Sequence, residues 1–499
     1  MRSSRRRLAA GLLLVPLVSG CFAATGSSSS DSDSGQSGRL RIALAFPPTQ
    51  NYSPYGLDAY SLSKLGVAEG LTRLDTSGTA APALAESWTS EPDGRNWVFT
   101  LRKAKFQDGT DLTPAAAAAA LTSASQVKPL PPALAGVTLT AEPVGANQVR
   151  ITTGAPDPVL PQRLSNPTLS VFSPKAYEKK DSVSPVGTGT GPFTITQTAG
   201  ATGATLERFD GYWGGRAEAP GIDVKFIADG TARANALRSG EADIAEAVPV
   251  SQAGSLDKSA VNETSTARLV SLHLNATAGP FTDPALRAAA RAAIDSSVLA
   301  KDVFEGRADP GQGLFGPALS WAAGKRVAPA GQAQPAAVKG TSITLATYDN
   351  RPELPETAQV LQQQLQRAGF TVKLEVRESS RLLGDALAGK FDAVLGSRNM
   401  MLDTGDPVSV LASDFTCAGS YNLSRLCDKA VDEAVAKAQA VADPGQRQSA
   451  AMAAEAAVLG TDAVVPLVHQ KTIVGVGPSA RNVVFDPYER LLVSTGTRR

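Results

Sequence analysis

Acidic and basic side chains gather in one short stretch of the chain, where they could hold a charged ligand. Arg398 is followed by Asp403 and Asp406 in the segment RNMMLDTGDP. A carboxylate enclosed with little water makes a strong charge-assisted hydrogen bond to a cation, and a guanidinium binds a carboxylate through two parallel donors. An aspartate of this segment, such as Asp403, has the chemistry to hold a cationic group. The alternative is that Asp403 only begins the turn before Pro407, where Asp406 is expected to cap a helix.

The other polar residues give no sign of catalytic chemistry. The sequence contains two histidines, His273 and His469, which are far apart along the chain. It lacks the G-x-S-x-G, H-E-x-x-H and G-x-x-x-x-G-K-[ST] motifs of hydrolases, zinc proteases and phosphate-binding loops. With 48 basic and 47 acidic residues, the chain also lacks the charge excess that nucleic-acid binding requires. We expect no enzymatic activity, no metal site, no cofactor and no nucleic-acid partner.

Three cysteines have two different predicted fates. Cys417 and Cys427 lie ten residues apart and are expected to form a disulfide in an exported protein. Two buried free thiols are the alternative, and a zinc site without a nearby histidine is a weaker one. Cys21 follows Ser19 and Gly20 behind an apolar stretch, which is typical of a bacterial lipoprotein signal.

The N-terminal segment predicts export and lipid attachment. Four arginines precede the apolar residues 8–18, a stretch that is shorter than the ~20 residues of a membrane-spanning helix. Residues 1–20 are thus read as a signal peptide, and residues 21–38 as a lipidated cysteine with a serine-rich tether that has too little apolar content to fold. Residues 4–9 also fit a twin-arginine export motif. The alternative is an ordinary cleavage site in which Cys21 is only a small residue.

The remaining ~460 residues exceed a single hydrophobic core and predict two or three domains. Strands are expected at 40–46, 97–102, 148–152, 193–197, 222–227, 269–274, 342–348, 372–376 and 393–395. Helices are expected from Pro114, from Pro284 through residue 304, over 353–369, over 431–441 and over 447–459. Asp283 is expected to cap the second of these helices. The Ala/Gly/Pro-rich residues 324–340 predict a surface linker.

A series of phrases, in order along the chain, resembles one family. They lie at residues 69–75, 82–88, 97–102, 105–113, 189–193, 211–215, 237–244, 274–275, 279–281 and 283–295. Together they resemble the peptide/nickel-binding substrate-binding proteins of ABC transporters, solute-binding protein family 5. The resemblance implies an α/β, two-lobed periplasmic-binding-protein fold with a hinge and an extra subdomain. Lobe one would comprise 39–71, 186–270 and 473–493, the subdomain 72–185, and lobe two 271–472.

The resemblance also implies a site between the lobes. In the peptide-binding branch an aspartate at the place of Asp403 grips the peptide's α-ammonium, and Gly405 belongs to the same segment. Arg351 and Arg398 are candidates for the peptide carboxylate. Tyr52 and Tyr55, with Tyr60 nearby, fall in a stretch that often lines the cleft.

The family further implies a cargo and partners. We expect a monomer, anchored outside the cytoplasm by lipid on Cys21, that carries di- or oligopeptides to an ABC permease and its ATPase. The alternative cargo is a nickel or opine–metal chelate. Remoter alternatives are a surface hydrolase, which the missing motifs disfavour, and a sensor with the same fold.

Overall fold

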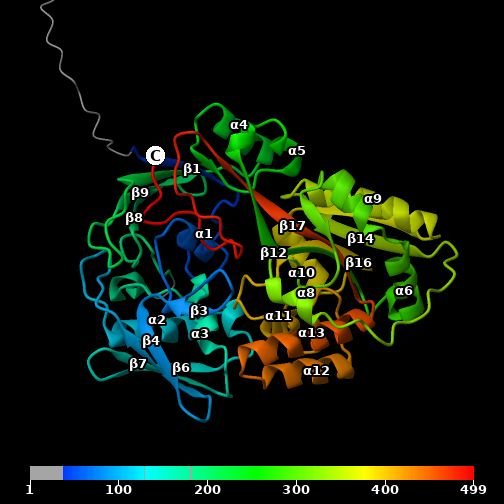
Figure 1. Ribbon diagram of the computed structural model, residues 1–499, viewed down its shortest axis with the longest axis horizontal. Helices are drawn as coiled ribbons and strands as arrows, with labels where there is room; N and C mark the ends of the chain where they lie inside the picture. Colours follow the sequence, from blue (N-terminus) through cyan, green and yellow to red (C-terminus); the bar gives the residue numbers. More distant parts are fainter. Residues whose placement is uncertain (1–37, 129, 180–181) are drawn as a thin grey trace, which may run out of the picture. The chain divides into compact units, whose positions relative to one another are not determined.

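The computed structural model describes residues 38–128, 130–179 and 182–499 (Figure 1). The described residues from Gly38 to Arg499 form one compact unit. Within the described residues, no helix combines the length and the apolar character needed to cross a bilayer. The predicted signal peptide, Cys21 and nearly all of the tether lie outside the described residues, so lipid attachment stays a prediction.

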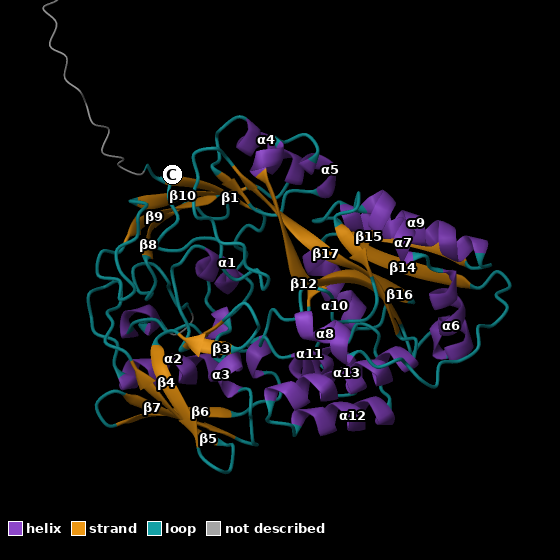
Figure 2. Cartoon of the chain, in the orientation of Figure 1, coloured by secondary structure: helices purple, strands orange, loops and turns teal. Residues whose placement is uncertain are grey.

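The central element is a mixed sheet of 11 strands. Its order is β15-β14-β16-β12-β17-β11-β1-β10-β9-β8, with β13 paired to β17. The strands span Leu40–Leu44 (β1), Phe193–Thr198 (β8), Gly203–Arg208 (β9), Gly221–Phe226 (β10), Ile244–Ala245 (β11), Val261–Leu274 (β12), Ala308–Pro310 (β13), Ser342–Tyr348 (β14), Thr371–Arg377 (β15), Ala393–Asn399 (β16) and Val464–Val476 (β17). Helices flank the sheet, which gives the mixed α/β fold that was predicted (Figure 2).

Two long antiparallel strands join the two parts of this sheet. β12 and β17 pair from Val261 opposite Gly475 to His273 opposite Val464, with register shifts on the way. At one end β17 pairs with β11, and at the other β12 pairs with β16. The sequence predicts only the second half of β12, because polar residues from Asn262 to Ser265 obscure the apolar pattern of its first half.

Strands β4 to β7 form a separate antiparallel sheet, at the lower left of Figure 1. The strands are β4 (Ala85–Ser90), β5 (Asn96–Leu101), β6 (Leu139–Val144) and β7 (Gln148–Thr153), and a small pair of β2 (Thr72–Leu74) and β3 (Ala80–Pro82) lies before them. Helix α2 (Pro114–Gln126) begins at Thr113, whose side chain accepts a hydrogen bond from the Ala116 amide. Trp97 and Phe106 are buried in the core that α2 covers.

The remaining helices are α1 (Asp58–Lys64), α3 (Leu160–Arg163), α4 (Gly230–Arg238), α5 (Val250–Ala253), α6 (Pro284–Ala293), α7 (Ser296–Val298), α8 (Ser320–Lys325), α9 (Glu353–Arg367), α10 (Ser379–Leu387), α11 (Pro407–Phe415), α12 (Lys429–Gln439) and α13 (Pro444–Gly460). Asp283 and Asp406 cap α6 and α11 as predicted, each accepting a bond from a first-turn amide. The predicted linker begins inside α8, and its remainder carries no helix or strand.

The single helix predicted from Pro284 through residue 304 is wrong. α6 ends at Ala293, because Ile294 adopts an extended conformation and Asp295 starts a new turn. The Asp295 carboxylate accepts bonds from both the amide and the hydroxyl of Ser297. Such local bonding competes with helix continuation, and the chain proceeds as α7 and a π-helical turn over Leu299–Val303.

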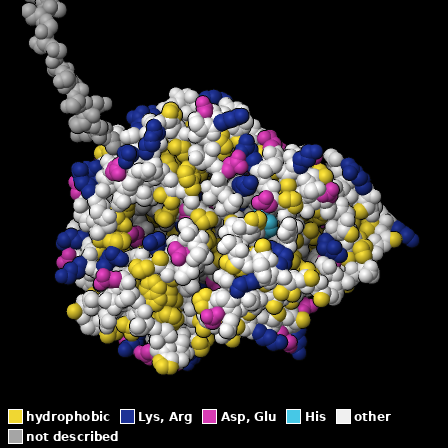
Figure 3. All heavy atoms as spheres, viewed as in Figure 1, with side chains coloured by type: hydrophobic (Ala, Val, Ile, Leu, Met, Phe, Trp, Pro, Cys, Tyr) yellow, Lys and Arg dark blue, Asp and Glu magenta, His cyan; other side chains and the backbone are white. Residues whose placement is uncertain are grey.

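Separate hydrophobic cores lie under these elements. One surrounds β1 and β8–β10, a second lies under the four-stranded sheet, a third packs α6 and α9 on β14 and β16, and a fourth packs α11–α13 together. On the face seen in Figure 3, side chains of both charges are interspersed. The lobe and subdomain boundaries stay predictions.

Candidate functional site

The turn that carries Asp403 lies between the end of β16 and the start of α11. Gly405 adopts a left-handed conformation there, with φ of +68°, and an added Cβ would lie 2.6 Å from Cδ1 of Leu74. The turn is anchored at its far end by Asp406. Besides capping α11, its buried carboxylate pairs with Arg447 of α13, at 2.7 Å between Oδ1 and Nε. The turn that carries Asp403 is therefore held between β16 on one side and the capped start of α11 on the other.

Arg398, the last residue but one of β16, binds two carboxylates at once. Its Nη2 lies 2.8 Å from Oδ2 of Asp403 and 3.1 Å from Oδ1 of Asp414. Its Nε lies 2.6 Å from Oδ2 of Asp414, which belongs to α11. The guanidinium also lies over the ring of Tyr421, 4.1 Å from the centroid. We call Arg398, Asp403, Asp414 and Tyr421 the Arg398 cluster.

Residues from the first part of the chain and from its C-terminal end surround Asp403. The phenol of Tyr60 in α1 donates to Oδ1 of Asp403 at 3.2 Å. The Asn166 amide donates to the main-chain oxygen of Asp403 and contacts the Tyr60 hydroxyl at 3.3 Å. Arg490 donates to the carbonyls of Leu402 and Ser165. Both oxygens of the Asp403 carboxylate are thus occupied by groups of the protein itself.

Burial controls the electrostatics of the cluster. It raises the pKa of Asp414 to about 6, although Arg398 pulls in the opposite direction. Burial alone would lower the pKa of Arg398, but Asp414 and Asp403 hold that pKa well above its usual range. His273 of β12, stacked on Phe415, is buried beside this charge, and its pKa falls to about 4. With both aspartates ionised, Arg398 and its two carboxylates together carry one negative charge.

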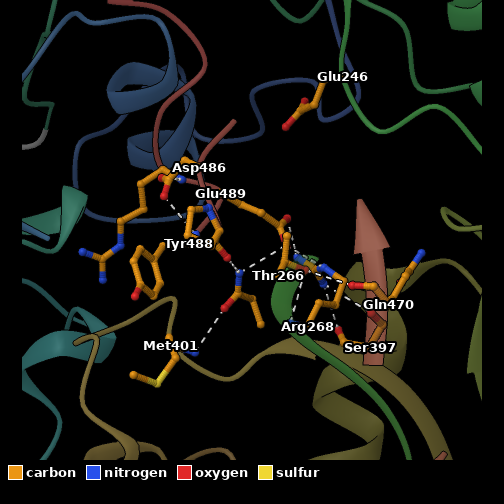
Figure 4. A network of polar contacts seen from close by, with 12 residues as sticks. Glu246, Thr266, Arg268, Ser397, Met401, Gln470, Asp486, Tyr488 and Glu489 are labelled. Atoms are coloured by element: carbon orange, nitrogen blue, oxygen red, sulfur yellow. Dashed lines mark hydrogen bonds and ion pairs between the residues drawn. The ribbon is translucent and has the colours of Figure 1, made fainter. Parts of the chain in front are cut away.

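A second polar network lies around Arg268 and Glu489 (Figure 4). Arg268 of β12 makes a bidentate ion pair with Glu489, at 2.9 and 2.7 Å. Asn399 donates to the same carboxylate at 3.2 Å. Burial alone would raise the pKa of Glu489, but the charge of Arg268 lowers it to about 2. Since Arg398 and Asn399 are successive residues of β16, their side chains leave opposite faces of the sheet.

Arg351 lies near the second network and not in the Arg398 cluster. Its guanidinium lies 5.6 Å from the ring centroid of Phe46. Burial lowers the pKa of Arg351, and the nearby charges of Arg268 and Glu489 also act on that pKa, in opposite directions. Arg351 lines a cavity of about 20 Å³ with Arg233, Glu353 and Lys471, among other residues. That volume holds one water-sized group, so a ligand carboxylate would need this region to open.

Tyr52 and Tyr55 lie in cores. The Tyr52 hydroxyl donates to the carbonyl of Gly203 at 3.0 Å, and its ring packs on Phe226. Tyr55 packs on the core beneath the four-stranded sheet, and its hydroxyl is buried. Of the three tyrosines in this stretch, Tyr60 contacts Asp403.

Sequence reasoning did not select Asn166, Asp414, Tyr421, Arg268 or Glu489. The Asn166–Pro167 pair, a combination typical of turns, is a local signal that could have indicated Asn166, whose side chain accepts from the amide of Thr168. The Cys417–Cys427 disulfide is confirmed, with an S–S distance of 2.09 Å. It closes the loop that carries Tyr421. Over the described ranges, no group of three or more potential metal ligands is found.

The fold and the paired long strands define a class, the two-lobed periplasmic binding proteins. NikA from Staphylococcus aureus, solved with Ni(L-His)2, superposes with a TM-score of 0.79 at 22% identity over 93% of this chain and 99% of its own. DppA from Helicobacter pylori, solved with the peptide STSA, gives 0.77 at 20% identity over 93% and 98%. The glutathione-binding protein GsiB of Shigella dysenteriae is 28% identical over 437 residues, which cover 81% of this chain and 83% of GsiB.

The family follows from the sequence match. The profile of the bacterial extracellular solute-binding proteins, family 5, matches residues 79–422, which is more than half of the chain. The protein belongs to that family, as the resemblance implied. Its members are extracytoplasmic substrate-binding components of ABC transporters, which work with permease and ATPase subunits and are not enzymes.

Proposed function

We propose that this protein captures di- or oligopeptides between its two lobes and delivers them to an ABC permease, tethered to the membrane by lipid on Cys21. The observation that carries the peptide assignment is the charge of the Arg398 cluster. One guanidinium faces two carboxylates, so Asp403 retains charge for a ligand's ammonium group. Relatives named for glutathione or solved with a peptide support the same class of cargo.

Binding would replace contacts that the protein now makes with itself. The ligand's ammonium group would take the place of the Tyr60 hydroxyl on Oδ1 of Asp403, the oxygen that Arg398 leaves open. β12 and β17 link the lobes and would serve as the hinge. In this proposal lobe one comprises 39–71, 186–270 and 473–493, lobe two 271–472, and 72–185 the subdomain. Arg351 would meet a ligand carboxylate after its small cavity opens.

A thermal-unfolding screen of residues 39–499 tests the cargo. The panel holds trialanine, a dipeptide, a pentapeptide, glutathione, and Ni²⁺ with histidine. A ligand at ~100 times its Kd adds about 2.7 kcal/mol to the free energy of unfolding. We expect stabilisation by amine-bearing peptides. Stabilisation by the nickel–histidine complex alone would contradict the proposal and favour the metal-chelate cargo.

A further inference from the structure

Asp414 is buried behind the arginine that contacts Asp403. It is 2% exposed, and its carboxylate lies between Arg398 Nε, Arg398 Nη2 and the hydroxyl of Ser413. Asp414 belongs to α11, whose N-terminus is fixed by Asp406 and Arg447. Its place is therefore set by the helix and not by the ligand. Asp403, by contrast, is on the turn that faces Tyr60.

The geometry divides one positive charge between two acids. Arg398 donates from Nη2 to both Asp414 and Asp403, and its Nε lies 2.6 Å from Oδ2 of Asp414. Without the carboxylate of Asp414, Arg398 would be free to turn both donors to Asp403, in the bidentate geometry that arginine prefers. The cluster would then carry no net charge, because Arg398 would neutralise Asp403. A ligand cation would have to compete with the guanidinium of Arg398 for the Asp403 carboxylate.

We propose that Asp414 is a positioning and specificity-determining residue, which holds Arg398 to one side so that Asp403 keeps a negative charge for a protonated amine. Asp414 itself does not touch the ligand. The inference rests on the proposed function, because it assumes that Asp403 meets the ligand's ammonium group. It assigns the preference for amine-bearing ligands to a residue outside the binding surface.

A pH dependence follows from this arrangement. Since the pKa of Asp414 is about 6, its carboxyl protonates as the pH falls below neutrality, and the cluster loses its negative charge. The charged and titratable groups that face Asp414 are Arg398 of β16, Asp403 of the turn, Tyr421 of the disulfide loop and, through Arg398, His273 of β12. His273 titrates near 4 and Tyr421 near 12, outside the relevant range.

Ligand binding must be linked to this proton. A bound cation favours the ionised form of Asp414, so binding near pH 6 should release protons. Calorimetry in two buffers of different ionisation enthalpy measures that release. A residue that only supports the fold would not produce it.

The experiment compares wild type with Asp414→Asn, Asp403→Asn and the exposed control Asp111→Asn, titrated with trialanine and glutathione between pH 5 and 8. Asp111 pairs with Lys105 at the surface, and its side chain is 73% exposed. We expect wild-type affinity to fall about tenfold from pH 7.5 to 5, with proton release near pH 6. Asp414→Asn should bind about tenfold more weakly at pH 7.5, with a flat profile between pH 5 and 7 and no proton release near pH 6, while Asp111→Asn matches wild type.

The outcomes separate this inference from the proposed function. If Asp403→Asn loses binding but Asp414→Asn keeps the wild-type affinity and pH profile, the inference is overturned and the proposed function stands. If wild type binds no amine-bearing peptide, both are overturned. Should Asp414→Asn fail to fold, the wild-type titration decides: an affinity that does not change between pH 5 and 8, with no proton release, overturns the inference.

Discussion

The phenol of Tyr60 donates a 3.2 Å hydrogen bond to Oδ1 of Asp403 and so joins helix α1 to a turn more than 300 residues further along the chain. On its other oxygen, Asp403 is paired with Arg398. The carboxylate that is proposed to bind the ligand thus also links α1 to β16. Ligand binding and the closure of the proposed lobes would therefore both involve the carboxylate of Asp403.

Substitution of Asp403 by Ala should weaken the binding of amine-bearing peptides by about 2–5 kcal/mol, the range for removing one side of a buried charge pair. The loss has two causes: the ligand's ammonium group has no partner, and Arg398 remains with Asp414 alone. Isothermal titration at pH 7.5 measures the loss, with Asp111→Asn as the control. Unchanged affinity would remove Asp403 from the site.

Substitution of Tyr60 by Phe should open the ligand-free protein. The change removes one hydroxyl, with its bonds to Asp403 and Asn166, and leaves the ring in its buried place. One hydrogen bond contributes about 0.5–1.5 kcal/mol, enough to shift a balanced equilibrium between open and closed forms. Small-angle scattering should show a larger radius of gyration for Tyr60→Phe without ligand and equal values with saturating ligand. If wild type and Tyr60→Phe had equal radii of gyration both without and with ligand, that result would argue against this role of Tyr60.

Reduction or removal of the Cys417–Cys427 disulfide should lower both stability and affinity. Replacing both cysteines by serine costs about 2–4 kcal/mol of unfolding free energy, by analogy with other small loops. The loop also carries Tyr421, whose ring covers Arg398. Chemical denaturation and peptide titration of the double variant measure the two effects. A loss of stability without any loss of affinity would show that Tyr421 stays in place without the bond.

The Arg268–Glu489 pair should make stability depend on pH. Its partners are buried, so Glu489→Gln is expected to cost about 3–5 kcal/mol. Since the folded pKa of Glu489, about 2, lies below its unfolded value of ~4.3, this contribution is present above pH ~4.3 and is lost as the pH falls toward 2. The stability difference between wild type and Glu489→Gln should therefore shrink in acid. A constant difference down to pH 2.5 would contradict this assignment.

Replacement of Cys21 by Ser should release the full-length protein from membranes, because the acyl chains proposed on Cys21 would supply its attachment. Fractionation of cells, with mass spectrometry of the N-terminal peptide, is the measurement. Detection of Cys21→Ser in the membrane fraction at the wild-type level would rule out lipid on Cys21 as the anchor.

The structural features that the sequence could predict rest mostly on local signals or on the family resemblance. The caps at Asp283 and Asp406 are predictable because the signal, a capping residue before proline, lies within two positions. The family phrases identified the fold. The break at Ile294 was missed because the alanines of α6 and the residues after it keep one helical pattern, and the competing bonds of Asp295 are side-chain interactions.

The partners within the site could not be predicted. Tyr60 meets Asp403, and Glu489 meets Arg268, across hundreds of residues, and no local periodicity records such a contact. Asp414 resembles any polar residue of a helix until α11 is placed beside β16. The family resemblance places Tyr52 and Tyr55 in a stretch that often lines the cleft, but an aromatic ring serves a core as well as a binding surface.

The most direct test of the central claim compares two ligands that differ in a single group. The affinity of residues 39–499 for trialanine and for N-acetyl-trialanine would be measured at pH 7.5 by titration calorimetry. Acetylation removes the positive charge and leaves the rest of the peptide unchanged. If Asp403 holds the ammonium group, the acetylated peptide should bind at least about 30-fold more weakly, the lower end of a 2–5 kcal/mol loss. Equal affinity for the two peptides would contradict the account.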